Sequence, residues 1–310
     1  MLIVTGSIAY DYIMDFPGAF SDHILPDHLH NINLSFIVEK FSKKYGGTAG
    51  NVSYTLGLLK TNHVLFSFAG NDFSEYKKAF QKLGIDTSNV QIDKDNYTAT
   101  AFAMADKDQN QIWGYFNGAA ANNVNLKLKK IARKNDLVLV GPQGVDGSMS
   151  LVKQCVELSI SYMFDPGFIL TQVTNKDLEL GLANAKFIIG NDYEINLIKD
   201  RIKNWQKIFS DKTVITTLGE KGSLISTNGK TYEIKPVKVS KVISTTGAGD
   251  AWRGGFLAGL EKGFDFQIAG QMGAVAASFA VEYHGTQEHF YTKRVFTKRY
   301  QDTYNQKIVL

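Results

Sequence analysis

The sequence predicts an α/β protein with a mainly parallel central sheet flanked by helices, and a small second sheet. Two observations predict the main layer: short apolar runs alternate with longer helical stretches, and ten or more residues separate most of the runs. Such spacing implies βαβ units and parallel pairing of the strands. The third observation is a pair of strand-like runs at 99–105 and 111–116 that break the alternation. These runs indicate the small sheet.

The elements of the main layer follow in order along the chain. Apolar runs predict strands at 2–6, 64–69, 137–140, 162–165, 187–190 and 214–217. Helices are expected between and after them, at 50–59, 74–83, 148–158, 251–262 and 266–282. A hairpin is expected at the sheet edge, where Asn228 and Gly229 join the runs 222–226 and 231–235, because Asn-Gly suits a two-residue turn.

The small sheet is expected to form a lid rather than a separate domain. Residues 11–45 look irregular and are rich in Phe, His and Pro, while the two later runs flank a polar turn at 106–110. A lid built from about 11–46 and 96–118 takes its pieces from separate stretches, so no linker divides the chain. The length allows two units of about 150 residues or one large α/β unit. We expect a single unit, 1–310.

Composition and charge exclude several classes of protein. With 44% hydrophobic and 21% charged residues the chain can bury its own core, and its one cysteine, Cys155, excludes an internal disulfide and indicates a reducing, cytoplasmic compartment. No run approaches the ~20 apolar residues of a membrane helix, and the N-terminus lacks the basic lead of a signal peptide. The net charge is +4, and the basic runs at 127–134 and 293–299 lack interleaved aromatic residues. They fit solvated helix faces better than a nucleic-acid surface.

The most informative stretch is 244–250, STTGAGD, which runs into the helix expected at 251–262. A glycine-rich turn before a helix points backbone N–H groups outward and makes an anion site. An aspartate there would be repelled by a phosphate unless it has a chemical task, such as taking the proton of an attacking hydroxyl. The other interpretation is a helix-cap turn with Asp250 as the cap. The chain has no Gly-x-x-x-x-Gly-Lys-Ser/Thr sequence, and no Gly-x-Gly-x-x-Gly follows the first strand.

Four motifs together resemble those of the PfkB (ribokinase-like) kinase family. The first family signature is similar to 46–53, GGTAGNVS, and the second to 245–250, TTGAGD, with Gly254-Gly255-Phe256. Residues 191–194, NDYE, match the Asn-x-x-Glu motif, and 217–222, TLGEKG, resemble the nucleotide-side loop. The N-terminal half and the stretch 285–288, GTQE, are similar to the bacterial adenosine kinase branch. The resemblance implies a ribokinase-like three-layer fold with a small β-sheet lid.

The resemblance also implies the chemistry. Asp250 would be the general base that activates the 5′-hydroxyl of a nucleoside for attack on the γ-phosphate of ATP. The anion hole would be formed by the amides of Gly247, Ala248 and Gly249. Mg²⁺ would be organised by Asn191 and Glu194 through water, because Mg²⁺ keeps much of its hydration shell. ATP would be bound by Asn191, Thr217, Gly219, Gly222 and Gly249.

The nucleoside side is implied in the same way. Asp11 and Asn51 would hold the ribose diol, and Gly47 would let the sugar approach the backbone, with Gly46-Gly47 as a hinge of the lid. Further substrate contacts are expected at Ser7, Ser35, Phe36, Phe102 and Phe116, the last two against the base. Two alternatives stay open: Asn51 as a helix-start hydrogen bond, and the aromatic residues as plain lid core.

Some positions depart from the family pattern. Ser244 stands where the second signature most often has Asp, near the monovalent-cation loop of the family, so K⁺ is expected only as an optional cofactor. Phe168 and Ile169 stand where adenosine kinases have polar residues, and no arginine is expected near the transferred phosphate. His23, His28 and His30 cluster in the sequence but lack further ligands at the spacing of a zinc site, so no zinc site is expected.

We therefore expect an ATP- and Mg²⁺-dependent nucleoside kinase, with adenosine as substrate and AMP as product. The alternatives are another nucleoside (inosine, guanosine, cytidine), a sugar such as ribose, or a non-catalytic nucleotide-binding protein on the same scaffold. The expected partners are small molecules, with neither nucleic acid nor membrane. Open strand edges of the lid could also pair two copies into a homodimer.

Overall fold

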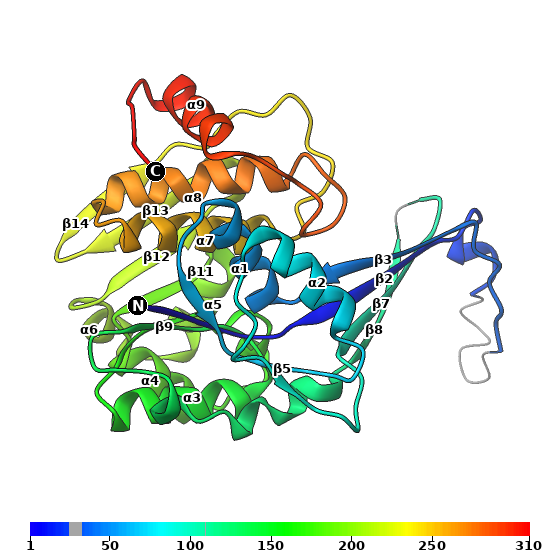
Figure 1. Cartoon of the computed structure of the whole chain (residues 1–310), viewed down its shortest axis with the longest axis horizontal. Coiled ribbons are helices and arrows are strands. Elements are labelled where there is room, and N and C mark those ends of the chain that lie inside the picture. The colour runs from blue at the N-terminus through cyan, green and yellow to red at the C-terminus, as the bar shows by residue number, and fades with distance from the viewer. Residues whose placement is uncertain (25–32, 109) are drawn as a thin grey trace.

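The computed structural model describes residues 1–24, 33–108 and 110–310 and has a central sheet with helices on both faces (Figure 1). The strand order is β14-β13-β12-β11-β10-β9-β1-β4, parallel from β12 to β4 and antiparallel at β13 and β14. The strands are β1 (Leu2–Thr5), β4 (His63–Leu65), β9 (Leu137–Val140), β10 (Ser161–Phe164), β11 (Phe187–Asn191), β12 (Thr213–Thr217), β13 (Ser223–Thr227) and β14 (Lys230–Ile234). The predicted α/β class and the edge hairpin are confirmed.

Side-chain alternation along the strands assigns each helix to a face. In β1, Leu2 and Val4 pack into one core while Ile3 packs into the other, as the two-residue period of a strand requires. One face is covered by α1 (Thr48–Leu58), α2 (Ser74–Leu83), α7 (Ala248–Glu261), α8 (Phe266–Ala280) and α9 (Lys293–Tyr304). The other is covered by α3 (Val145–Glu157), α4 (Asn175–Asn184), α5 (Asp192–Arg201) and α6 (Trp205–Phe209). Buried on both sides, the parallel strands read as continuous apolar runs.

A four-stranded sheet extends away from this body at the right of Figure 1. Its order is β3-β2-β7-β8, and its strands are β2 (Ala9–Asp15), β3 (Lys40–Gly46), β7 (Ala99–Ala105) and β8 (Gln111–Phe116). The strands predicted at 99–105 and 111–116 are confirmed. The expectation that 11–45 is irregular is wrong at both ends, because β2 and β3 pair over seven residues each. We call these four strands the small sheet.

Several local expectations need correction. The strand expected at 64–69 splits, because β5 (Phe68–Ala69) leaves the main sheet to pair with β6 (Gln91–Ile92). The basic run at 127–134 contains a short 3-10 turn, Leu128–Lys130, rather than a helix face, whereas the run at 293–299 lies on α9 as expected. Residues 25–32, which include His28 and His30, and residue 109 of the polar turn lie outside the described residues. Within the described ranges, every helix is too short or too polar to cross a membrane.

Candidate active site

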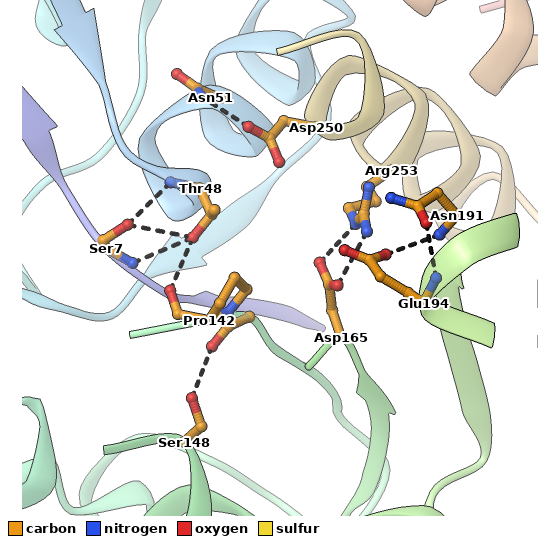
Figure 2. A network of polar contacts seen from close by, with 11 residues as sticks. Ser7, Thr48, Asn51, Pro142, Ser148, Asp165, Asn191, Glu194, Asp250 and Arg253 are labelled. Carbon is orange, nitrogen blue, oxygen red and sulfur yellow. Dashed lines mark hydrogen bonds and ion pairs between the residues drawn. The ribbon is translucent and has the colours of Figure 1, made fainter. Parts of the chain in front are cut away.

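The predicted site residues gather where the parallel strands end. Ser7 follows β1, Asp165 follows β10, and Asn191 ends β11 beside Thr217, its register partner on β12. The carboxyl ends of parallel strands are where open α/β sheets bind ligands. Helix α7 begins above the same edge and brings Asp250 to it (Figure 2).

The turn before α7 has free backbone donors. Gly247 has φ +80°, and a Cβ there would lie 2.8 Å from the Thr286 side chain, so only glycine fits. The Ala248 amide donates to the Thr245 carbonyl at 3.2 Å, so it is used by the turn itself. Across the described residues, the amides of Gly247, Gly249 and Asp250 have no acceptor. The amides open to an anion are therefore the expected ones of Gly247 and Gly249, together with that of Asp250 in place of Ala248.

Asp250 is half-buried, lies beside Asn51 and does not cap its helix. The N-cap of α7 is Gly247, which excludes the interpretation of Asp250 as a helix cap. Asn51 Nδ2 donates to Asp250 Oδ2 at 2.8 Å (Figure 2). Burial raises the pKa of Asp250 to about 6, with Arg253 and the Asn51 hydrogen bond acting in the opposite direction. A carboxylate with a pKa near neutrality suits proton abstraction at physiological pH.

Asp11, on β2, faces the same space. Burial raises the pKa of Asp11 to about 6, and the charge of Asp250 acts in the same direction. Its carboxylate oxygens accept no hydrogen bond from another described residue. Gly46 leaves it room, since a Cβ there would overlap the Asp11 carboxylate. Asp11 is therefore a half-buried acceptor available for hydroxyl donors.

Two other predicted sugar contacts are already tied into the protein. Ser7 Oγ accepts from the Thr48 amide at 3.1 Å, and Thr48 Oγ1 donates to the Pro142 carbonyl at 3.1 Å, which fixes the start of α1 (Figure 2). Asn51 is buried and bonded at both ends of its amide, to Asp250 and to Gln287. The helix-start alternative for Asn51 is thus not observed. The close approach seen at Gly47 is that of the protein's own backbone, because a Cβ there would lie 2.6 Å from the Ser7 carbonyl oxygen, and the approach of a sugar stays a prediction.

Two of the residues predicted for ATP and Mg²⁺, Asn191 and Glu194, lie at the start of α5. The Asn191 side chain accepts from the Glu194 amide and the Glu194 carboxylate accepts from the Asn191 amide, both at 2.8 Å, which forms a capping box. One Glu194 oxygen stays outside that pair. The neighbouring loop turns through Gly219, φ +59°, and Gly222, φ +93°. Within the described ranges, no group of three or more His, Cys, Asp or Glu side chains is placed to hold a metal ion.

Sequence reasoning missed an arginine at the centre of this site. Arg253 Nη2 donates to Asp165 Oδ1 at 2.9 Å, and Arg253 Nε lies 2.5 Å from Asp165 Oδ2, in a pair whose side chains are only 9% and 3% exposed (Figure 2). Arg253 Nη1 lies against the turn, 2.8 Å from where a Cβ on Gly249 would stand. The expectation of no nearby arginine is wrong. The spacing in the sequence could have indicated this arginine, because Asp250 and Arg253 are three residues apart and therefore share one face of the helix.

The register of the small sheet separates the predicted aromatic contacts from Asp11. Asp11 pairs with Ala101, which pairs with Tyr115, so these three side chains share one face. Phe102 pairs with Tyr12 and stacks on it at 5.3 Å, on the opposite face. Phe116 pairs with Thr100, two residues before Phe102, and shares that opposite face. The aromatic residues on the Asp11 face are Trp113 and Tyr115, which stack on each other at 5.8 Å.

Other predicted residues lie away from Asp250. Ser35 and Phe36 precede the end of β3 that pairs with Asp15, at the far end of the small sheet. Phe36 packs there against Phe16 at 4.8 Å, in a cluster of aromatic rings. Of the two apolar residues after Asp165, Phe168 is exposed and Ile169 is in the core.

Comparisons with known proteins agree with this geometry. The family model described as pfkB family carbohydrate kinase matches residues 7–293. A nucleoside kinase of Methanocaldococcus jannaschii is 31% identical over 282 residues, 87% of this chain and 92% of that protein. The structure of Burkholderia thailandensis nucleoside kinase in complex with inosine has a TM-score of 0.87 at 32% identity and covers 99% of both chains. An adenosine kinase of Saccharomyces cerevisiae is 45% identical over 74 residues, 23% of this chain and 22% of that protein.

The fold is therefore the ribokinase-like α/β fold, with a mostly parallel sheet between layers of helices. The family match covers most of the chain, and the acidic and amide groups at the carboxyl edge fit phosphoryl transfer to a hydroxyl. This chain belongs to the pfkB family of carbohydrate kinases and is a phosphotransferase with an alcohol acceptor.

Proposed function

We propose that this protein transfers the γ-phosphoryl group of ATP to the 5′-hydroxyl of a nucleoside, with adenosine as the expected substrate and AMP as the product. One observation carries the proposal: the Asp11 carboxylate, which lies against Gly46, and Asp250, which accepts from Asn51 at 2.8 Å, stand in one site, where the charge of Asp250 acts on Asp11. A ribose whose diol donates to Asp11 can direct its 5′-hydroxyl toward Asp250. The relatives named as nucleoside kinases support this substrate class.

The chemistry follows from the placement of Asp250. Its carboxylate takes the 5′-hydroxyl proton as that oxygen forms a bond to the γ-phosphorus, and the bond to the ADP oxygen breaks in line. The amides of Gly247, Gly249 and Asp250 hold the charge on the transferred group, since they have no other acceptor in the described ranges. The Asp165 carboxylate fixes the Arg253 guanidinium at this turn, and Arg253 Nη1 donates to the transferred phosphoryl group.

Mg²⁺ is part of the proposal and would arrive with ATP. The residues fit an ion held through its water molecules rather than a closed protein cage: Glu194 has one oxygen outside the capping box, and the Asn191 side-chain oxygen is used within it. When bound, Mg²⁺ neutralises charge on the phosphates. The case for K⁺ is weaker. Ser244 carries no charge, and its hydroxyl accepts from the Thr246 amide at 3.2 Å, so a monovalent cation stays a prediction.

The small sheet is proposed to be the lid, with Gly46-Gly47 as its hinge. Closure would exclude water from the phosphoryl group. Because Ala101 stands between Asp11 and Tyr115, its small side chain leaves a flat floor across neighbouring strands about 4.8 Å apart. A base attached to a ribose on Asp11 would lie over this floor against Tyr115 and Trp113. In this proposal Tyr115 and Trp113 make the contacts with the base that were expected of Phe102 and Phe116.

Two coarser parts of the proposal concern the whole molecule. The strands β3 and β8 are the edges of the small sheet in the described chain, and exposed edges can pair with another copy, so a homodimer through the lid is proposed. A cytoplasmic location is proposed because Cys155 is a free buried thiol.

The test is a substrate panel for purified protein with ATP and Mg²⁺, with product identified by ³¹P NMR. The panel contains adenosine, inosine, guanosine, cytidine and ribose. Inosine is the second candidate, because the Burkholderia structure was solved with it. Fast formation of AMP supports adenosine; turnover of ribose alone contradicts the nucleoside assignment. Binding of ATP without any turnover would contradict catalysis and favour a binding protein.

A further inference from the structure

A segment with two buried residues, Thr286 and Gln287, joins the small sheet to the turn that carries Asp250. Residues 285–288 contact the end of β3 at consecutive positions. Glu288 pairs with Lys44 at 3.0 Å, and Thr286 Oγ1 donates to the Tyr45 carbonyl at 2.9 Å. The same Thr286 packs against Gly247 at the start of α7. The segment therefore touches both the hinge side of the small sheet and the anion-binding turn.

Gln287 completes a hydrogen-bonded chain from that hinge to the Asp250 carboxylate. Tyr76, on α2, donates to the Gly46 carbonyl at 2.9 Å. Gln287 Nε2 lies 2.5 Å from the Tyr76 oxygen and 2.9 Å from Asn51 Oδ1. Asn51 Nδ2 then donates to Asp250 at 2.8 Å. The three linking side chains are buried, Tyr76 completely, so water does not compete for these bonds.

The direction of every bond in the chain is fixed from both ends. The single Tyr76 hydroxyl hydrogen goes to the Gly46 carbonyl, so its oxygen must accept, and the Gln287 atom facing it must be the amide nitrogen. An ionised Asp250 can only accept, so Asn51 must turn its nitrogen toward it and its oxygen toward Gln287. Both ends give the same orientation of the Gln287 amide. A Cβ on residue 50 would overlap the Tyr76 hydroxyl, so Gly50 makes room for the chain.

We propose that Gln287 and Tyr76 are positioning residues that link the hinge of the small sheet to the orientation of Asp250. This inference rests on the proposed kinase function and deepens it. Movement of β3 at Gly46 shifts Tyr76, Gln287 and Asn51 in turn, and Asp250 holds its in-line orientation only when the chain is complete. The hinge position that closes the small sheet over the site thus also fixes the orientation of the Asp250 carboxylate. Closure and proton abstraction are coupled in this way.

The decisive variant is Gln287→Glu, which keeps the shape of the side chain but loses its hydrogen-bond donors. A carboxylate at this position would repel Asn51 Oδ1 and turn the Asn51 amide, so that the amide oxygen would face Asp250. We expect kcat to fall about ten- to hundredfold, with KM for adenosine and ATP within about twofold, because misplacement of a catalytic group is costly while the ligand contacts stay. Tyr76→Phe cuts the link at the hinge and should lower kcat less. In the double variant the loss should equal that of Gln287→Glu alone, since both act through one chain.

A matched control separates positioning from stability. Tyr162→Phe removes one hydroxyl that donates to the Gly181 carbonyl at 2.7 Å, in the core on the opposite face of the main sheet. It should lose stability like Tyr76→Phe and keep its kcat. Wild-type kcat in Gln287→Glu and Tyr76→Phe, or losses that multiply in the double variant, would overturn the inference.

Hydrogen exchange gives a second readout that needs no turnover. In Gln287→Glu, peptides covering 45–51 and 247–251 should both exchange faster than in the wild type and in Tyr162→Phe. Unchanged exchange in either peptide would overturn the chain, even if the substrate panel showed that the protein phosphorylates no nucleoside. A failure of the proposed function alone would leave the exchange result as expected.

Discussion

The neighbouring carboxylates Asp11 and Asp250 predict an unusually steep acid limb in the activity. The pKa of each is raised to about 6, chiefly by burial, and the charge of Asp250 contributes to the raised pKa of Asp11. Both act as carboxylates in the proposed mechanism, Asp11 to accept the diol and Asp250 to accept the proton. Activity is therefore present above the raised pKa values and is lost as the pH falls through them. The perturbation is a pH titration of kcat/KM for adenosine, which reports the free enzyme.

The magnitude follows from the two ionisations. A group with a pKa of about 6 is ionised to about one part in eleven at pH 5, so two required groups reduce kcat/KM by roughly a hundredfold relative to the plateau. The limiting slope of log kcat/KM against pH approaches two. In Asp11→Asn only one of the groups remains, so the slope should approach one and the fall at pH 5 should be roughly tenfold.

The assay is coupled or quenched detection of AMP between about pH 4.5 and 8 at saturating ATP and Mg²⁺. Ionisation of ATP acts equally on wild type and Asp11→Asn, so the difference between their slopes isolates Asp11. Circular dichroism at each pH confirms that the fold persists. Equal slopes for the two proteins, or a wild-type profile that stays flat down to about pH 5, would refute the reasoning from paired carboxylates.

Three further outcomes are expected. Arg253→Met should lower the free energy of unfolding in urea by about 3–5 kcal/mol, because it leaves Asp165 charged, buried and unpaired; Arg253→Met with Asp165→Leu should recover stability but not kcat, and recovery of both would remove Arg253 from the chemistry. Tyr115→Ala should raise KM for adenosine by about fivefold or more while Phe116→Ala leaves it unchanged, since base–aromatic stacking contributes about 1–3 kcal/mol; the reverse order in steady-state assays would contradict the register argument. Asp11→Ala should raise KM for adenosine strongly and abolish the preference of the enzyme for adenosine over 2′-deoxyadenosine. If the variant still preferred adenosine, Asp11 would not be the residue that binds the diol.

The main sheet was predictable because buried parallel strands are written as continuous apolar runs. Runs such as 137–140 became β9 with the same bounds. The small sheet was harder. Strand β3, KFSKKYG, has neither an apolar run nor a clean alternation, because few of its side chains are buried. Residues 68–69 also mislead, since whether they continue β4 depends on a distant partner at 91–92.

The site was predictable where one local motif supplies the functional groups. It was not predictable where strand pairing or a distant partner determines the position of a side chain. The turn at Gly247 and the proposed base Asp250 are read from seven consecutive residues. The face of an aromatic residue on the small sheet depends on register, which moves every side chain when it shifts by one residue. Arg253 and Gln287 depend on partners far away in sequence, Asp165 and Asn51, which only the folded chain brings together.

Replacement of Asp250 by asparagine tests the central claim most directly. The asparagine side chain keeps the size of the native one and an oxygen for the Asn51 hydrogen bond, but it cannot take a proton. Single-turnover transfer from ATP to adenosine should fall by about 10²–10⁴-fold, while calorimetry should give unchanged Kd values for both ligands. Transfer at the wild-type rate by Asp250→Asn would contradict the assignment of Asp250 as the base.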